Sequence, residues 1–172
     1  MHGLLPWLRD CELAKLVCAI PVYGTDGGNY TELWFEDGRR VVVNNRLRTV
    51  IGWMARFFGV DVDQEDAVWH REAKKSHSNY SHRNRPLALI PSIILVPVAV
   101  RKPQYRDHGG VGYVVRQKIL GWEKYEGGEY RSRLFLAGGQ ILFCLHNDRT
   151  LTYRITLADR IGRRYQEIVT AL

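Results

Sequence analysis

The sequence predicts an α+β fold built on an antiparallel-rich β-sheet, and three observations support this prediction. Short apolar runs typical of strands are separated by Asp-Gly and Gly-Gly pairs that favour hairpins. Two segments, at about 46–58 and 157–171, carry apolar residues at helical spacing. The regular strand-helix-strand alternation that builds parallel sheets is not seen. With 172 residues, of which 45% are hydrophobic, the chain has enough material for one domain over 1–172, with 1–12 as an arm or short helix.

The first third of the chain predicts a strand, a hairpin and a helix. The run LAKLVCAIPV at 13–22 suits a strand, although its first half also fits a helix. Apolar runs at 33–35 and 41–43 flank an Asp-Gly turn. Asn44 and Asn45 offer capping side chains for the helix at 46–58, and Gly59 is suited to end it. The helix has one apolar stripe, formed by Leu47, Val50, Ile51, Met54 and Phe58.

The middle of the chain predicts a connector followed by a buried strand pair. The acidic run at 61–66 lacks the glycine and closing glutamate of a calcium loop, so we expect a solvated connector, with a short helix reaching 75 as an option. The run PLALIPSIILVPVAV at 86–100 is rich in Ile, Leu and Val and is interrupted by Pro91 and Pro97. It is shorter than the roughly 20 residues that a membrane helix needs, which favours buried strands.

The last third predicts further strands and a terminal helix. Strand character at 109–122 is followed by a turn or loop at 123–130 and by a hairpin over 131–145. A strand is then expected from Leu151, where apolar and polar residues alternate. Thr156 and Asp159 have capping-box spacing for the amphipathic helix at 157–171. The expected apolar face of this helix comprises Leu157, Ile161, Tyr165, Ile168 and Leu172.

Positive charge is concentrated in one stretch, residues 70–106, which we call the basic segment. Between His70 and His108 there are eight Lys or Arg against the two acids Glu72 and Asp107, in a protein whose formal net charge is +7. A solvated charged face is the plain interpretation. Counterion release at phosphates makes a nucleic acid the natural partner of such a cluster.

The composition of the basic segment predicts how it would contact DNA. Lys and Arg neutralise phosphates, and polar side chains in the stretch SHSNYSHRNR can donate to phosphates or base edges. Arginines on a flexible loop can also enter a narrow A·T-rich minor groove. The predicted contact residues are Arg71, Lys74, Lys75, His77, Asn79, Tyr80, His82, Arg83, Arg85, Arg101, Lys102 and Arg106.

Other chemistry finds little support in the sequence. Phosphate-binding, dinucleotide-binding, zinc-protease and serine-hydrolase motifs are missing, so we expect no enzyme. Cys144 and His146 lack a third catalytic partner, and the spacing of His70, His77 and His82 does not fit a metal site. We predict no metal and no cofactor. The odd number of cysteines, three, favours free thiols in a reducing cytoplasm.

A series of short motifs resembles the ComK family of competence transcription factors. In order, the motifs are RFFG at 56–59, REAKK at 71–75, RPLAL at 85–89, ILVPVAVR at 94–101, GYV at 112–114 and QILFCLHNDRTLTYRIT at 140–156. The resemblance covers about residues 13–170. The chain departs from the family at His70, Arg71 and Glu72, where members usually carry a Gly-Arg-Lys patch. A second departure is at 112–114, where members often have Cys-x-Trp.

The resemblance implies a cytoplasmic, nucleoid-associated activator that binds paired A·T-rich boxes in double-stranded DNA, largely through the minor groove. It also implies a homo-oligomer with no membrane association that controls genes for DNA uptake. Whether a proteolytic adaptor controls the protein is left open. The end of the chain is also similar to LytTR DNA-binding domains. Two other classes stay open at this point: an RNA-binding or ribosome-associated module, and a small enzyme with an anionic substrate.

Overall fold

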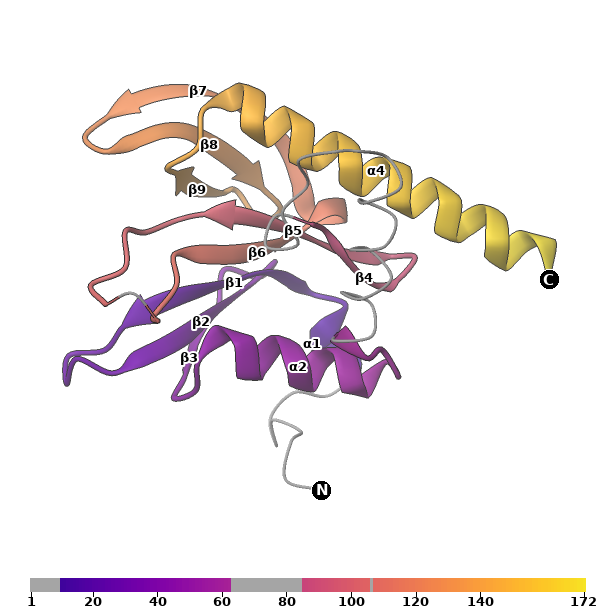
Figure 1. The fold of residues 1–172 in the computed structure, drawn as a ribbon, viewed down its shortest axis with the longest axis horizontal. Coiled ribbons are helices and arrows are strands. Elements are labelled where there is room, and N and C mark those ends of the chain that lie inside the picture. Colours follow the sequence, from indigo (N-terminus) through magenta and orange to yellow (C-terminus); the bar gives the residue numbers. More distant parts are fainter. Residues whose placement is uncertain (1–9, 63–84, 106) are drawn as a thin grey trace.

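The computed structural model describes residues 10–62, 85–105 and 107–172 and has the mixed α+β fold that the sequence predicts (Figure 1). All the paired strands in these ranges run antiparallel. No helix among them is both long and apolar enough to cross a membrane. In chain order the elements are α1 (Asp10–Leu13), β1 (Leu16–Tyr23), β2 (Asn29–Phe35), β3 (Arg40–Val43), α2 (Leu47–Phe57), β4 (Leu87–Ile90), β5 (Ile93–Ala99), β6 (Val111–Val115), the 3₁₀ helix η2 (Arg116–Lys118), β7 (Ile119–Gly127), β8 (Tyr130–Leu136), β9 (Gln140–Cys144) and α4 (Asp148–Ala171).

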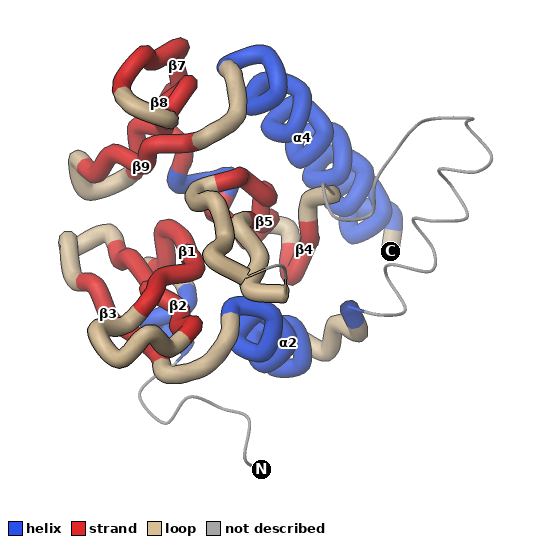
Figure 2. Tube along the Cα trace, turned by 60° about the vertical axis from the view of Figure 1, so that its left-hand side comes forward, coloured by secondary structure: helices blue, strands red, loops and turns tan. Residues whose placement is uncertain are grey.

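The strands form two sheets. The larger has six strands in the order β3-β2-β1-β6-β5-β4, and the smaller has the order β7-β8-β9. Helix α2 covers one face of the larger sheet, while the smaller sheet and α4 cover the other face (Figures 1 and 2). The larger sheet is therefore the middle layer. Because both its faces are covered, β5 is buried along six of its seven residues, which explains the uninterrupted apolar run in the sequence.

The predicted mid-chain helix is confirmed as α2. Its buried face consists of Val50, Ile51, Met54 and Ala55. The cap differs from the prediction, because Arg46 occupies the N-cap position and no side chain accepts a hydrogen bond there. The helix ends as expected just before Gly59, whose φ of +72° is in the left-handed region that suits glycine.

Two predictions in the last third are wrong. The expected loop at 123–130 is mostly strand, since β7 runs to Gly127 and β8 begins at Tyr130. The strand expected from Leu151 is the first part of α4, which begins at Asp148 rather than near 157. The side chain of Asn147 accepts a hydrogen bond from the backbone N–H of Thr150, at 2.9 Å, and so caps this helix.

The reason for the second error is that one apolar pattern fits two structures. Leu151 and Ile155 lie two strand repeats apart, but they also lie one helical turn apart. In the structure they share the buried face of α4 with Arg154 and Ala158. The predicted apolar face centred on Ile161 and Tyr165 is therefore not the one that packs against the sheets, and Ile168 is 56% exposed.

The chain contains the same arrangement of elements twice. The first module, residues 16–57, runs β1-β2-β3-α2, and the second module, residues 119–171, runs β7-β8-β9-α4. Each is a three-stranded antiparallel meander followed by a helix. A short helical turn precedes both, α1 in one case and η2 in the other. The sequence repeats at constant spacing: Thr31 corresponds to Ser132, Leu33 to Leu134, Trp34 to Phe135, Gly38 to Gly139, Val42 to Phe143, Arg48 to Arg149 and Thr49 to Thr150.

The two modules also share local details that the order of elements does not require. In the first module the pairing of β1 with β2 shifts register between Leu16 and Cys18. In the second module the pairing of β7 with β8 shifts in the same way between Ile119 and Gly121. The hydroxyl of Thr31 donates to a carbonyl oxygen 14 residues later, at 2.8 Å. Ser132 does the same over the same separation, at 2.5 Å. Both hydroxyl residues are fully buried, so each bond ties the turn before the helix to the central strand of its meander.

Candidate nucleic-acid interface

The predicted buried strand pair is the hairpin β4–β5, in which Leu87 pairs with Leu95 and β5 continues to Ala99 before the chain reaches Arg101. Because the strands are antiparallel, the chain enters β4 and leaves β5 at the same end of the hairpin (Figure 1). We call this the open end, in contrast to the turn at Pro91. Arg85 lies just before β4, and the connection of residues 100–110, which we call the β5–β6 loop, follows β5.

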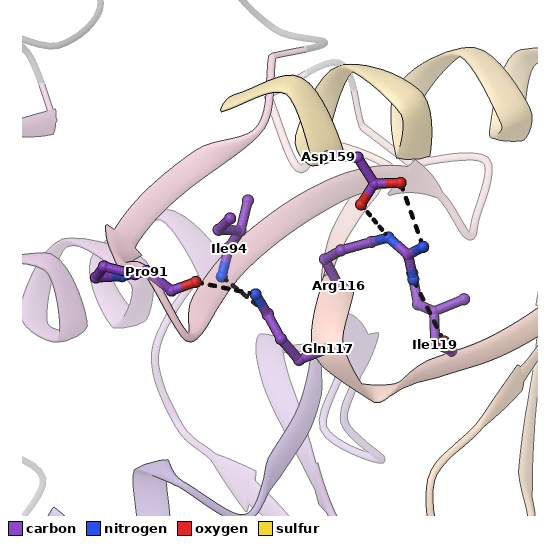
Figure 3. Close-up of polar contacts among 6 residues, drawn as sticks. All are labelled: Pro91, Ile94, Arg116, Gln117, Ile119 and Asp159. Atoms are coloured by element: carbon purple, nitrogen blue, oxygen red, sulfur yellow. Dashed lines mark hydrogen bonds and ion pairs between the residues drawn. The ribbon is translucent and has the colours of Figure 1, made fainter. Parts of the chain in front are cut away.

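The turn end of the hairpin is fixed to its surroundings (Figure 3). The Gln117 amide group donates to Pro91 O at 3.1 Å and accepts from the backbone N–H of Ile94 at 3.3 Å. The neighbouring Arg116 donates from Nε to Asp159 Oδ1 of α4, at 2.7 Å. These contacts join the hairpin turn, η2 and α4, so the hairpin is a rigid support for what its open end carries.

Arg85 is placed inside the protein. Its side chain is 4% exposed and donates from Nη2 to Val62 O at 3.4 Å. It thereby joins the start of β4 to the segment that follows α2. A guanidinium so enclosed has no surface to offer a DNA groove in this conformation. Arg85 therefore joins the start of β4 to the segment after α2, whereas the sequence predicts it as a DNA contact.

Arg101 organises the β5–β6 loop. Its Nε donates to Gly109 O at 3.0 Å, and its Nη2 donates to Asn29 Oδ1 at 2.5 Å and to His108 O at 3.1 Å. The guanidinium also lies 4.0 Å from the centre of the Tyr23 ring. Burial lowers the pKa of Arg101 from its ordinary value, which for arginine is high enough to keep the charge at neutral pH. Through Nε and Nη2, Arg101 thus holds the loop and joins it to Asn29.

Tyr23 ties down the same loop from the end of β1. Its hydroxyl oxygen accepts from the backbone N–H of Gln104 at 2.8 Å and lies 3.0 Å from His108 Nδ1. Sequence reasoning missed Tyr23, Asn29 and His108, because Tyr23 and Asn29 precede the loop by more than 70 residues and only the sheet order brings them to it. A tyrosine at the end of a strand, with its polar tip beyond the apolar run, was the one available signal.

The exposed side chains of the described part of the loop are those of Lys102, Pro103, Gln104, Tyr105 and Asp107. Lys102 is 77% exposed, and its Nζ lies 3.9 Å from Glu129 on the β7–β8 hairpin, a surface pair of small energetic value. Tyr105 is 63% exposed, and its ring meets the His108 ring edge-on at 4.8 Å. The anchored loop therefore carries an exposed cation and, three residues later, an exposed aromatic ring.

Most of the predicted contact residues lie outside the described ranges. These are Arg71, Lys74, Lys75, His77, Asn79, Tyr80, His82, Arg83 and Arg106. The connector beyond Val62 and its optional helix to 75 lie there too. The structure therefore describes three of the predicted contact residues: buried Arg85, loop-holding Arg101 and exposed Lys102.

Cys144 and His146 do not form a reactive pair in the structure. Cys144 is fully buried, and this burial raises the pKa of its thiol to about 12, so the thiolate needed for nucleophilic chemistry is scarce at neutral pH. Burial, and secondarily the charge of Arg154, lowers the pKa of His146 to about 4. The histidine is therefore neutral at pH 7.

Within the described residues, no three His, Cys, Asp or Glu side chains lie close enough to hold a metal ion. Cys18 and Cys144 are free and buried. Comparison of the chain with protein-family models, with curated proteins and with solved structures finds no match.

Proposed function

We propose that this protein is a DNA-binding transcription factor of the kind that the ComK resemblance implies, acting in the cytoplasm on A·T-rich duplex sites. One observation carries the proposal. The described part of the basic segment, from Arg85 to Lys102, is built on one hairpin, β4–β5, whose turn is hydrogen-bonded to Gln117. Charges delivered from a rigid support bind a polyanion with little loss of conformational entropy.

The described residues support different roles for the individual cations of this interface. Arg101 and Tyr23 hold the β5–β6 loop, from which the exposed side chains of Lys102 and Tyr105 extend. Lys102, together with Lys74 and Lys75 of the basic segment, makes phosphate contacts. Arg83 enters the minor groove of A·T-rich sites, where the negative potential is enhanced. Arg85 and Arg101 act indirectly, by fixing the backbone from which the contacting residues extend.

An RNA-binding function is the second candidate, because the same cations would also suit RNA phosphates and Tyr105 could stack on a base. We prefer double-stranded DNA as the partner because the chain carries a series of motifs that resembles the competence regulators. An enzymatic function has less support, because Cys144 carries a neutral thiol and His146 a neutral imidazole at pH 7.

A gel-shift competition at one stated salt concentration separates these functions. Labelled A·T-rich duplex is competed with unlabelled A·T-rich duplex, G·C-rich duplex and structured RNA. The proposal expects the A·T-rich duplex to compete best, and expects Arg83→Ala to reduce this preference while Lys102→Ala weakens binding to both duplexes alike. Structured RNA as the best competitor would instead assign the protein to the RNA-binding class.

A further inference from the structure

Helix α2 and the strand before it carry a second concentration of positive charge, outside the basic segment. Residues 38–60 include no Asp or Glu and have five arginines, Arg39, Arg40, Arg46, Arg48 and Arg56. Arg39 forms an ion pair with Glu12, and the Arg40 guanidinium lies 3.6 Å from the centre of the Trp34 ring. The other three arginines are exposed, and within the part of the chain that the structure describes no carboxylate forms an ion pair with them. Their charges are therefore available to an external partner.

The outer face of α2, opposite the residues packed on the larger sheet, has little side-chain bulk between its arginines. Arg48 and Arg56 lie two turns apart, which is about 12 Å along the helix axis. Gly52 is midway between them, and the nearest heavy atom to a Cβ added at this position would be Arg56 Nη2, at 3.9 Å. Packing would accept alanine there, and helices favour alanine over glycine. Glycine at this position leaves the helix backbone open to close approach by a partner.

The N-terminus of α2 lacks the stabilising residues that α4 has at the corresponding positions. Asn147 caps α4 and Asp148 follows in its first turn, which suits the positive end of the helix dipole. In α2 the N-cap residue is Arg46, and the first turn has Arg48 and no acid. Cations are unfavourable at this end of a helix. Because α4 shows that the fold accepts a capped, acidic start, the arginines of α2 are better explained by a partner than by helix stability.

The connection of residues 63–84 begins and ends on the side of the larger sheet that α2 covers. Four of the eight Lys and Arg of the basic segment belong to this connection. It follows Val62 and leads to Arg85, whose Nη2 donates to Val62 O at 3.4 Å. Val62 and the adjoining Leu87 both belong to the core cluster that α2 forms with this side of the sheet. These cations are therefore tethered where one polyanion can reach both them and α2.

We propose that the outer face of α2 is a second DNA-contacting surface, which lies across the major groove of the duplex that the basic segment binds. The major groove is about 12 Å wide, so Arg48 and Arg56 can each contact phosphates of one bordering strand while Gly52 lets the helix approach. This surface rests on the proposed function but is separate from the basic segment, whereas the ComK resemblance implies contact largely through the minor groove. A lipid surface is a poorer occupant, because a membrane-bound helix buries its apolar face in lipid and that face of α2 is packed on the sheet.

Fluorescence anisotropy with the full chain and a labelled A·T-rich duplex tests the proposal. The double variant Arg48→Ala/Arg56→Ala removes two phosphate contacts, so the ratio of wild-type to variant affinity should fall about tenfold as salt rises from about 50 mM to about 200 mM. The matched control is Arg149→Ala/Arg160→Ala, which removes the same charge from exposed positions of α4, where Arg149 is the counterpart of Arg48. Its affinity should follow that of the wild type at every salt concentration. Thermal melting verifies that each variant folds.

A charge introduced at the centre of the proposed contact gives a second readout. Gly52→Glu places a carboxylate against the phosphates and should weaken duplex binding by about tenfold or more. Thermal stability should not fall, because glutamate is a better helix former than glycine. The matched control is Tyr153→Glu at the corresponding position of α4, where Tyr153 is 61% exposed, and it should leave binding unchanged.

Duplex binding that Gly52→Glu and Arg48→Ala/Arg56→Ala leave unchanged would overturn the inference while the proposed function stands. Equal losses in the α4 controls would overturn it as well. A wild-type protein that binds no duplex would overturn both the inference and the proposed function. Co-sedimentation with phosphatidylserine vesicles that Arg48→Ala/Arg56→Ala abolishes, with unchanged duplex affinity, would make α2 a lipid-contacting helix instead.

Discussion

The first and second modules have the same order of elements and the same register slip, but they differ in what surrounds them. The first module is joined to the larger sheet, since β1 pairs with β6 along its outer edge. The second module keeps a separate three-stranded sheet and continues into a helix of 24 residues, where α2 has 11. The modules therefore share the residues that build the meander and differ in the surfaces they leave uncovered.

The helices illustrate this difference most clearly. The buried residues of α2 extend as far as Ala55, so nearly the whole helix is packed. The buried residues of α4 end at Ala158, and the helix then extends beyond the sheets (Figure 1). Shared positions thus belong to the fold, whereas the added length of α4 and its exposed residues are particular to the second module.

The largest expected effect tests whether the modules are equivalent in the core. Leu33 and Leu134 occupy corresponding positions, and both are 0% exposed. Leu33→Ala and Leu134→Ala should each lower the free energy of unfolding by about 3–5 kcal/mol, since each removes buried methyl groups and leaves a cavity. Urea denaturation measures both. A loss several-fold greater in one variant than in the other would break the equivalence.

The hydrogen bonds that the Thr31 and Ser132 hydroxyl groups donate to the turns before the two helices should give the next largest effect on stability. Thr31→Val and Ser132→Ala leave a buried carbonyl without its donor, and each should cost about 1–3 kcal/mol in urea denaturation. The exchanges Thr31→Ser and Ser132→Thr keep the donor and serve as controls. If the exchanges cost as much as the deletions, side-chain volume rather than the shared hydrogen bond would explain the equivalence of these positions.

Acid sensitivity should arise from the second module. The carbonyl that Ser132 contacts belongs to His146, whereas the corresponding residue in the first module is the non-titrating Asn45. The pKa of His146 is about 4 in the folded protein, below the ordinary 6.5, so the unfolded chain binds more protons between these values. Acidification from pH 6.5 to pH 4 should therefore reduce stability, by about 1–2 kcal/mol after allowance for partial solvent access to the ring.

The control for this pH dependence is His146→Gln, which lacks the titrating ring. The difference in free energy of unfolding between wild type and His146→Gln should shrink or reverse as the pH falls from 7 toward 4. A wild-type protein and a variant that respond to pH in parallel would mean that other groups cause the acid sensitivity.

Local patterns allowed much of the fold to be predicted from the sequence. The hairpin around Gly38, the helix α2 and the strand pair β4–β5 each follow from turn residues or apolar periodicity within a short window. The start of α4 was predicted wrongly because the spacing of Leu151 and Ile155 fits both strand and helix periodicity. Its cap, Asn147, was the deciding signal.

The repeat and the candidate site were less accessible to sequence reasoning. Matches such as Thr31 with Ser132 are chemical rather than exact, and their shared role depends on hydrogen bonds across the fold. The sequence identified Arg101 as a cation but not as the centre of a network, because Tyr23 and Asn29 lie far from it along the chain. Burial of Arg85 likewise depends on the segment after α2 returning to the start of β4.

The salt dependence of DNA affinity tests the proposed function most directly. If the basic segment contacts about four to six phosphates, log affinity for an A·T-rich duplex should fall with log salt with a slope of about −4 to −5. Replacing Lys74 and Lys75 by Ala should reduce this slope by about 2, whereas Arg160→Ala, an exposed cation on α4 outside the segment, should leave it unchanged. A wild-type slope near zero with tight binding, or an equal change from Arg160→Ala, would contradict a DNA interface centred on the basic segment.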